Sequence, residues 1–178
     1  MKKLVIMLHG VGSNGADIAP IAAYWQRSIP ELEFASPDAP FRFMNSPEAF
    51  QWFDLAGVTE QNRPERIINA RAAFDATVTQ ILDQHQMLDK LEQVVFCGFS
   101  QGSMMALDVV ASGRWQIAGV IAMSGRLSTP IEAEASRQSK VLLLHGMADQ
   151  VVPAQESIQA EQKLAKAGFE VQLHTYAD

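Results

Sequence analysis

One serine of this chain lies between two glycines, in the segment Gly98-Phe99-Ser100-Gln101-Gly102. An apolar run suited to a buried parallel strand precedes the segment, and residues that favour a helix follow it. A sharp strand-to-helix turn needs small residues at these two positions, because the two backbones approach each other closely there. The pattern therefore predicts a nucleophile elbow, in which the hydroxyl of Ser100 attacks an acyl carbon.

A glycine-rich turn, His9-Gly10-Val11-Gly12, follows the apolar strand expected at residues 4–8. A tetrahedral intermediate of acyl transfer needs two N–H donors that are in place before charge develops on the carbonyl oxygen. We expect these donors to be the backbone N–H groups of Val11 and Gln101, the oxyanion hole. Because the backbone donates, side-chain changes at Gln101 should matter less than changes that redirect the loop. The alternative is a plain strand-to-helix turn.

An acid follows a later apolar strand, in the segment His145-Gly146-Met147-Ala148-Asp149. An acid in this place can orient a catalytic histidine and stabilise the imidazolium that forms during acyl transfer. The order also fits, since a serine followed by an acid is the chain order of α/β-hydrolases. Asp149 is therefore the candidate acid of a triad, and the alternative is a turn residue before Pro153.

The elements that position these residues alternate between strand and helix patterns along the chain. The strands are expected at residues 4–8, 32–36, 94–97, 117–123, 141–145 and 169–176. One helix should begin near Pro64, and a second should cover 154–167 and end at Gly168. Such alternation predicts an α/β fold with a mostly parallel sheet covered by helices. With 178 residues and no linker or repeat, residues 1–178 should form a single domain.

Composition excludes several classes of protein. A net charge of -6 argues against a nucleic-acid binder, and no stretch approaches the length of a membrane span. The apolar run after Lys2 and Lys3 is too short for a signal peptide. Cys97 is the only cysteine, so no internal disulfide can form, which suits the cytoplasm. Cys97 itself is interpreted as an inert core residue rather than a nucleophile.

A long segment without a clean period, residues 41–62, is rich in aromatic side chains and methionine. Its place in the chain predicts an excursion from the sheet that reaches the side of the site. There, Trp52 and Phe53 could form a substrate-binding wall for an acyl or alkyl group. The alternative is that these two aromatics are a satellite core that pins the excursion.

The whole chain resembles the phospholipase/carboxylesterase family of α/β-hydrolases, which includes bacterial serine esterases and acyl-protein thioesterases. The resemblance covers these segments: 9–12, 37–40, 51–54, 98–102, 123–126 and 145–149. Residues 57–63 point further, to small bacterial esterases of that family. The resemblance implies an α/β-hydrolase fold and hydrolysis of a small-molecule carboxylic ester or thioester, with no metal and no cofactor.

The family places its catalytic histidine in a short Gly-His segment after the last core strand, and then adds a final helix. Asp178 stands where that segment should begin, so we expect residues 1–178 to lack both features. The four histidines present are expected to serve elsewhere: His9 and His145 as loop braces, His85 near a helix end and His174 on a polar strand face. An uncovered sheet face would follow, and with it a tendency to form a homodimer.

Three functions therefore stay open. The first is a serine esterase, and the second is a thioesterase or lysophospholipase acting through the same residues. The third is a non-catalytic binding module with a hydrolase fold, favoured by the absent histidine but not by the elbow serine. Dienelactone hydrolase chemistry is a further alternative, although it would normally use cysteine where this chain has Ser100.

Overall fold

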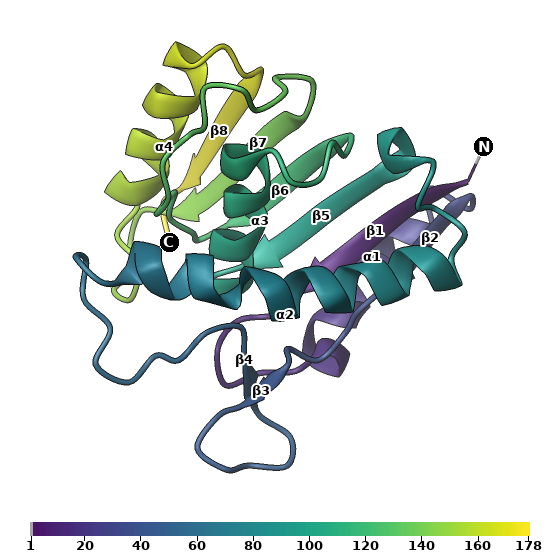
Figure 1. Ribbon diagram of the computed structural model, residues 1–178, viewed down its shortest axis with the longest axis horizontal. Coiled ribbons are helices and arrows are strands. Elements are labelled where there is room, and N and C mark those ends of the chain that lie inside the picture. The colour runs from purple at the N-terminus through teal and green to yellow at the C-terminus, as the bar shows by residue number, and fades with distance from the viewer. Residues whose placement is uncertain (1) are drawn as a thin grey trace.

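All six strands expected from the apolar runs are present in the computed structural model, which describes residues 2–178. They are β1 (Lys3–Leu8), β2 (Leu32–Ala35), β5 (Val94–Phe99), β6 (Gly119–Met123), β7 (Lys140–Gly146) and β8 (Val171–Tyr176). They form one sheet in the order β2-β1-β5-β6-β7-β8, and each of its pairings is parallel. The predicted α/β class and its parallel sheet are confirmed (Figure 1).

The strand order reverses between β1 and β5, and this reversal decides where a site can form. From β1 the chain adds β2 on one side, whereas β5 pairs with the other side of β1 and the later strands follow outward. Leu8 at the end of β1 is paired with Gly98 near the end of β5. The loops that follow these two strands therefore emerge side by side. In open parallel sheets, ligands bind at such a switch point, beside the carboxyl ends of the strands.

Helices cover both faces of the sheet, but not equally. The helices are α1 (Gly15–Gln26), α2 (Arg63–Gln84), α3 (Gln101–Ser112) and α4 (Gln155–Lys166). In Figure 1, α2, α3 and α4 lie in front of the sheet and α1 lies behind it. The larger apolar core lies on the α2–α4 side, where Phe74 and Phe96 are fully buried. A smaller core joins α1 to the other side of β1 through Met7 and Ile18.

The α1 side of the sheet is partly open. Two hollows of about 530 and 450 Å³ lie along strands on this side, and the β5 and β6 residues Val95 and Ile121 line both of them. α1 packs mainly on β1 and β2, which leaves this part of β5 to β8 without a helix among residues 2–178. The expectation of a partly uncovered face therefore agrees with the structure.

Between β2 and α2 the chain leaves the sheet, as expected from the aperiodic aromatic segment. It forms a small antiparallel hairpin, β3 (Phe41–Arg42) and β4 (Phe50–Gln51), which projects below the sheet in Figure 1. A short 3-10 helix, Leu91–Gln93, precedes β5. None of the helices described over residues 2–178 has the length and hydropathy required to cross a bilayer.

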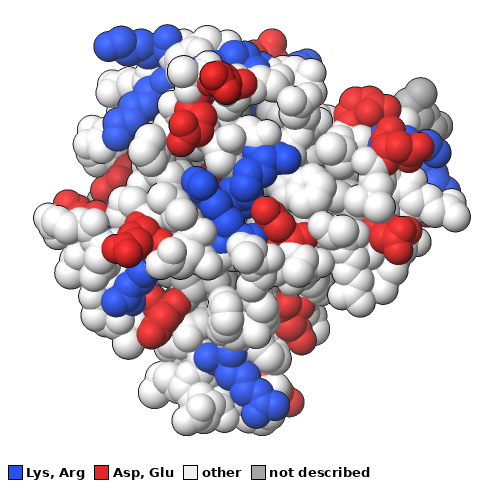
Figure 2. Space-filling view, in the orientation of Figure 1, with Lys and Arg blue, Asp and Glu red and all other residues white. Residues whose placement is uncertain are grey.

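A buried charge cluster fastens α3 to α2. Asp108 in α3 is 1% exposed, and its carboxylate accepts from Arg71 of α2 at 2.9 and 2.7 Å and from Arg114 at 2.7 Å. Burial acts to raise the pKa of Asp108, but these two guanidinium groups and the Thr129 hydroxyl hold it below its usual value. Elsewhere, on the face shown in Figure 2, Lys and Arg side chains are interspersed with Asp and Glu.

Candidate active site

Ser100 has the strained backbone that a nucleophile elbow requires. It is the single residue between β5 and α3, and its φ of 53° and ψ of −114° lie in a region that non-glycine residues rarely enter. A hydrogen bond of 2.8 Å from the Ser100 N–H to the Met123 carbonyl oxygen holds this conformation. Backbone strain of this kind costs about 1–3 kcal/mol and persists only where the surroundings enforce it.

The two glycines around Ser100 are required by close backbone contacts. A Cβ atom on Gly98 would lie 2.5 Å from the carbonyl carbon of Gly102, and a Cβ atom on Gly102 would collide with the carbonyl oxygen of Leu8. β1, β5 and α3 therefore meet at the elbow with no room for a methyl group. This is the steric reason for the glycine spacing in the sequence.

In the loop after β1, the N–H of Val11 is left without a protein acceptor among residues 2–178. The Gly12 N–H donates to the Phe50 carbonyl oxygen at 2.8 Å, and the Ser13 N–H donates to that of Gly10 at 3.2 Å. The Gln101 N–H opens helix α3, where a helix has no internal acceptor for its first amides. Both predicted oxyanion donors are thus available to an acyl oxygen.

Asp149 lies beyond the carboxyl end of β7, as predicted. Its Oδ1 atom accepts from the N–H groups of Val151 and Val152, each at 2.9 Å. Burial acts to raise the pKa of Asp149, but these two N–H donors, His145 and the Ser124 hydroxyl outweigh burial and lower it. The carboxylate therefore stays ionised at neutral pH, with Oδ2 not engaged by the two amides.

His145 is a brace rather than a base. Its side chain is fully buried, and Nε2 lies 3.6 Å from Asp149 Oδ2. Nε2 donates to the Val152 carbonyl oxygen at 2.7 Å, and Nδ1 accepts from the Ser157 hydroxyl at 2.6 Å. With both ring nitrogens engaged, His145 holds the loop between β7 and α4 and cannot take a proton from Ser100.

Comparison with known proteins identifies the family of this chain. The profile of the Phospholipase/Carboxylesterase family matches residues 1–178. The chain belongs to this family. Esterase YpfH of Escherichia coli (strain K12) is 29% identical over 177 residues, which span 99% of this chain and 75% of that protein. Acyl-protein thioesterase 1 of Saccharomyces cerevisiae is 28% identical over 179 residues, which span 90% of this chain and 76% of that protein.

The fold of the phospholipase/carboxylesterase family is confirmed by solved structures. The crystal structure of esterase PE8 superimposes with a TM-score of 0.83 at 32% identity, covering 98% of this chain and 82% of that one. The resemblance read from the sequence segments is therefore correct, and the chain is a hydrolase with the α/β-hydrolase fold.

The other histidines are also engaged or remote from the elbow of this hydrolase. His9 is 1% exposed, and its Nε2 accepts from the Ala39 N–H at 2.9 Å. Its proton therefore resides on Nδ1, which lies 2.7 Å from the Gly10 carbonyl oxygen. His85 pairs with Glu33 at 3.1 Å, and His174 is exposed on edge strand β8. Within residues 2–178, no histidine hydrogen-bonds to Ser100.

Burial lowers the pKa of His9, because the imidazolium form would lose its hydration. The unfolded chain therefore takes up a proton on this residue at a higher pH than the folded chain does. The free energy of unfolding should fall as the pH is lowered from about 7 to about 5.5. His9→Gln should flatten this slope in urea titrations, and equal slopes in both proteins would contradict a buried neutral His9.

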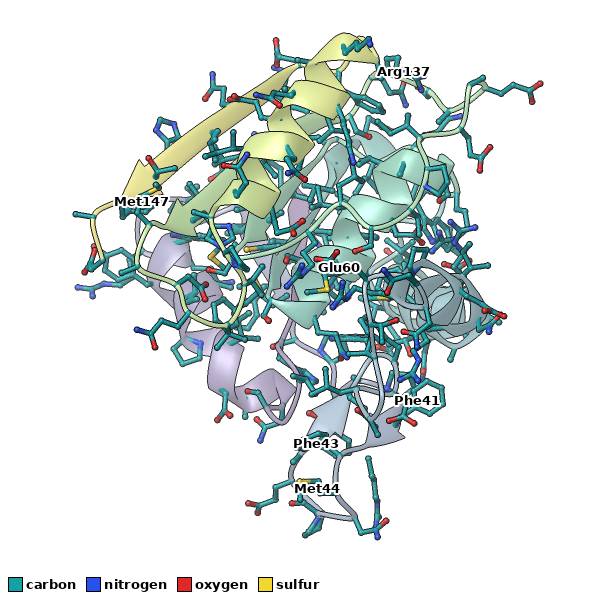
Figure 3. The ribbon with its side chains drawn as sticks, turned by 90° about the vertical axis from the view of Figure 1, so that its left-hand side faces the viewer. Phe41, Phe43, Met44, Glu60, Arg137 and Met147 are labelled. Carbon is teal, nitrogen blue, oxygen red and sulfur yellow. The ribbon has the colours of Figure 1, made fainter. Side chains whose placement is uncertain are left out.

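Trp52 and Phe53 lie in the core of this hydrolase rather than on an open wall. They are 1% and 4% exposed, and the Trp52 ring packs edge-on against Phe74 with centroids 5.6 Å apart. Their burial favours the alternative that they pin the excursion. Apolar side chains of the excursion are exposed on the hairpin instead, where Phe41 is 44% and Met44 82% exposed (Figure 3).

Sequence reasoning missed the side chain of Gln101. This amide is 2% exposed, whereas the sequence pattern predicts a role only for the backbone N–H of Gln101. Its Oε1 accepts from the Trp52 N–H at 2.6 Å, and its Nε2 donates to the Phe53 carbonyl oxygen at 2.8 Å. A polar residue in the first turn of a buried helix was the only available signal.

The structure places Cys97 in the core. Cys97 is fully buried, and burial raises the pKa of its thiol to about 12, so the thiol stays protonated and unreactive. This agrees with its interpretation as a core residue.

Over residues 2–178, no three side chains of the ligating types (His, Cys, Asp, Glu) are grouped so as to hold a metal ion.

Proposed function

We propose that this hydrolase cleaves small carboxylic esters through an acyl-enzyme formed on Ser100. The observation that supports this best is the elbow itself: Ser100 is held at a φ of 53°, directly before a helix whose first N–H is free. A residue that only bound a ligand would have no need of this strain. The names of the relatives, an esterase and an acyl-protein thioesterase, support the same chemistry.

The proposed reaction has two halves. The hydroxyl oxygen of Ser100 bonds to the acyl carbon as its proton passes to a base, and the N–H groups of Val11 and Gln101 hold the oxyanion. The intermediate then collapses, the C–O bond to the alcohol breaks and the alcohol leaves with that proton. Water repeats the sequence on the acyl-enzyme and releases the acid, which regenerates the Ser100 hydroxyl.

The base in this scheme is a histidine that Asp149 orients. Since no histidine within residues 2–178 is placed for this step, we assign it to none of them. The family pattern puts the base after the last core strand, and the chain spans about three quarters of the length of the curated relatives it matches. Activity is tested on the full-length protein. A cytoplasmic location and a homodimer remain predictions from composition and from the open sheet face.

Hydrolysis of p-nitrophenyl butyrate and covalent capture by a fluorophosphonate probe test the proposal together. Both require an activated serine, and absence of both from the folded gene product would refute it. The second candidate, thioester hydrolysis, is favoured by the thioesterase relatives. A butyryl thioester measured beside the oxygen ester separates the two by the ratio of their kcat/KM values.

Gly12→Val is expected to lower kcat for p-nitrophenyl butyrate by about 10²-fold, the effect of losing one oxyanion donor. Gly12 has a φ of +79°, and a Cβ atom there would lie 3.4 Å from the Phe43 ring, so valine must redirect the loop that presents Val11. Gly57→Val is the control, because Gly57 has a similar φ of +71° in an exposed loop. Equal kcat in both variants would argue against the loop as a donor.

A further inference from the structure

The two oxyanion donors come from loops that follow different strands, so their separation must be fixed by contacts between those loops. The donor loop after β1 contains Val11, and the other donor is at the start of α3 after β5. Oxyanion stabilisation depends on donors that do not need to reorganise during the reaction. The structure contains a chain of side-chain hydrogen bonds that joins the two loops through the excursion.

The first link of this chain is the Gln101 side chain. Its backbone N–H is the donor, while its amide binds both polar groups around the Trp52–Phe53 peptide: the Trp52 N–H at 2.6 Å and the Phe53 carbonyl oxygen at 2.8 Å. One donor and one acceptor are both required, because a side chain that lacked either would leave a buried backbone group without a hydrogen-bond partner. The two hydrogen bonds therefore require an amide side chain at position 101.

The second link is the Trp52 indole. Its Nε1–H donates to the His9 carbonyl oxygen at 2.9 Å, and the ring lies 5.5 Å from the His9 ring. The His9 carbonyl belongs to the peptide unit that leads into Gly10 and Val11, so this bond sets the direction in which the loop leaves β1. On the far side, His9 Nε2 accepts from the Ala39 N–H at 2.9 Å.

We propose that the Gln101 side chain and the Trp52 indole are positioning residues, which hold the N–H groups of Gln101 and Val11 at a fixed separation for the oxyanion. The inference rests on the proposed esterase function. It revises the expectation that side-chain changes at Gln101 matter less than changes that redirect the loop after β1. It also gives Trp52 a task that its complete burial allows, since the indole acts through the His9 carbonyl rather than on the substrate.

The test compares Trp52→Phe with Trp115→Phe in the complete gene product. Trp52→Phe keeps an aromatic ring but removes the N–H donated to His9. Trp115 also donates through its indole, at 3.0 Å to Asp75, but it follows the C-terminal end of α3, so it is a matched control for the loss of such a bond. Trp52→Phe should lower kcat for p-nitrophenyl butyrate about tenfold or more with KM changed less than about twofold, because the oxyanion forms only in the transition state. Trp115→Phe should leave both constants unchanged.

Gln101→Glu gives an independent arm if Trp52→Phe folds poorly. Glutamate has the shape of glutamine and can accept from the Trp52 N–H, but it places a carboxylate oxygen against the Phe53 carbonyl oxygen. We expect kcat to fall at neutral pH and to recover in part as the pH is lowered and the carboxyl is protonated, which a purely structural defect would not reproduce. If the parent hydrolyses the ester but Trp52→Phe matches Trp115→Phe and Gln101→Glu matches the parent, the positioning role is wrong. If the parent itself fails to hydrolyse the ester, the proposed function is wrong instead.

Discussion

Replacing Ser100 with alanine is expected to abolish ester hydrolysis, with a loss in kcat of about 10⁴-fold or more. The fluorophosphonate label should disappear as well, because Ser100 supplies the nucleophile in the proposed reaction. Donors for the oxyanion remain in this variant, so a residual rate above that of water, on the order of 10³-fold, is compatible with the mechanism. The rate with p-nitrophenyl butyrate and the labelled mass measure the two effects.

The same position separates chemistry from packing. Alanine at position 100 must adopt the same φ of 53°, so its free energy of unfolding should stay close to that of the parent. Ser100→Gly relieves the strain and should be inactive but more stable by about 1 kcal/mol. Ser112→Ala, on the same helix but at its other end, is the control and should retain activity. Labelling that persists in Ser100→Ala would overturn the assignment of the nucleophile.

Gly102→Ala is expected to produce a large loss of stability. The added methyl group would collide with the carbonyl oxygen of Leu8, so α3 must move away from β1 or the fold must open. Overpacking of this kind costs about 1–3 kcal/mol and more where the backbone cannot shift. A displaced α3 also moves Ser100 and the Gln101 N–H, so hydrolysis should fall with stability.

Urea unfolding monitored by circular dichroism measures this loss. Gly168→Ala is the control, because a Cβ atom there would lie 4.0 Å from the Arg137 side chain, so its cost should come only from the φ of +98°. A Gly102→Ala protein with the stability and activity of the parent would show that the contact between α3 and β1 is not close.

The parts of the site that follow buried strands could be predicted from sequence. Each of the segments that contain Val11, Ser100 and Asp149 comes directly after a short apolar run. In a parallel sheet the carboxyl ends of such strands share one edge, so strand recognition alone predicts that the three residues lie at the same edge. Glycines at positions 98 and 102 were informative for the same reason, since only a close backbone contact requires both.

The contacts of the excursion could not be predicted. Residues 41–62 have no helix or strand period, so neither the hairpin nor the buried orientation of Trp52 is encoded in a local pattern. The hydrogen bonds that decide its place join Gln101 to residues 49 and 48 positions earlier in the chain. Such pairings depend on which polar groups remain unsatisfied after the sheet has formed, and sequence alone does not give that information.

The hairpin and the donor loop after β1 are hydrogen-bonded to each other. The Gly12 N–H donates to the Phe50 carbonyl oxygen at 2.8 Å, and the Phe50 N–H donates to the Ser13 carbonyl oxygen at 2.9 Å, so β4 is hydrogen-bonded directly to the donor loop. A displacement of the hairpin tip near Met44 would therefore also displace the peptide that presents Val11.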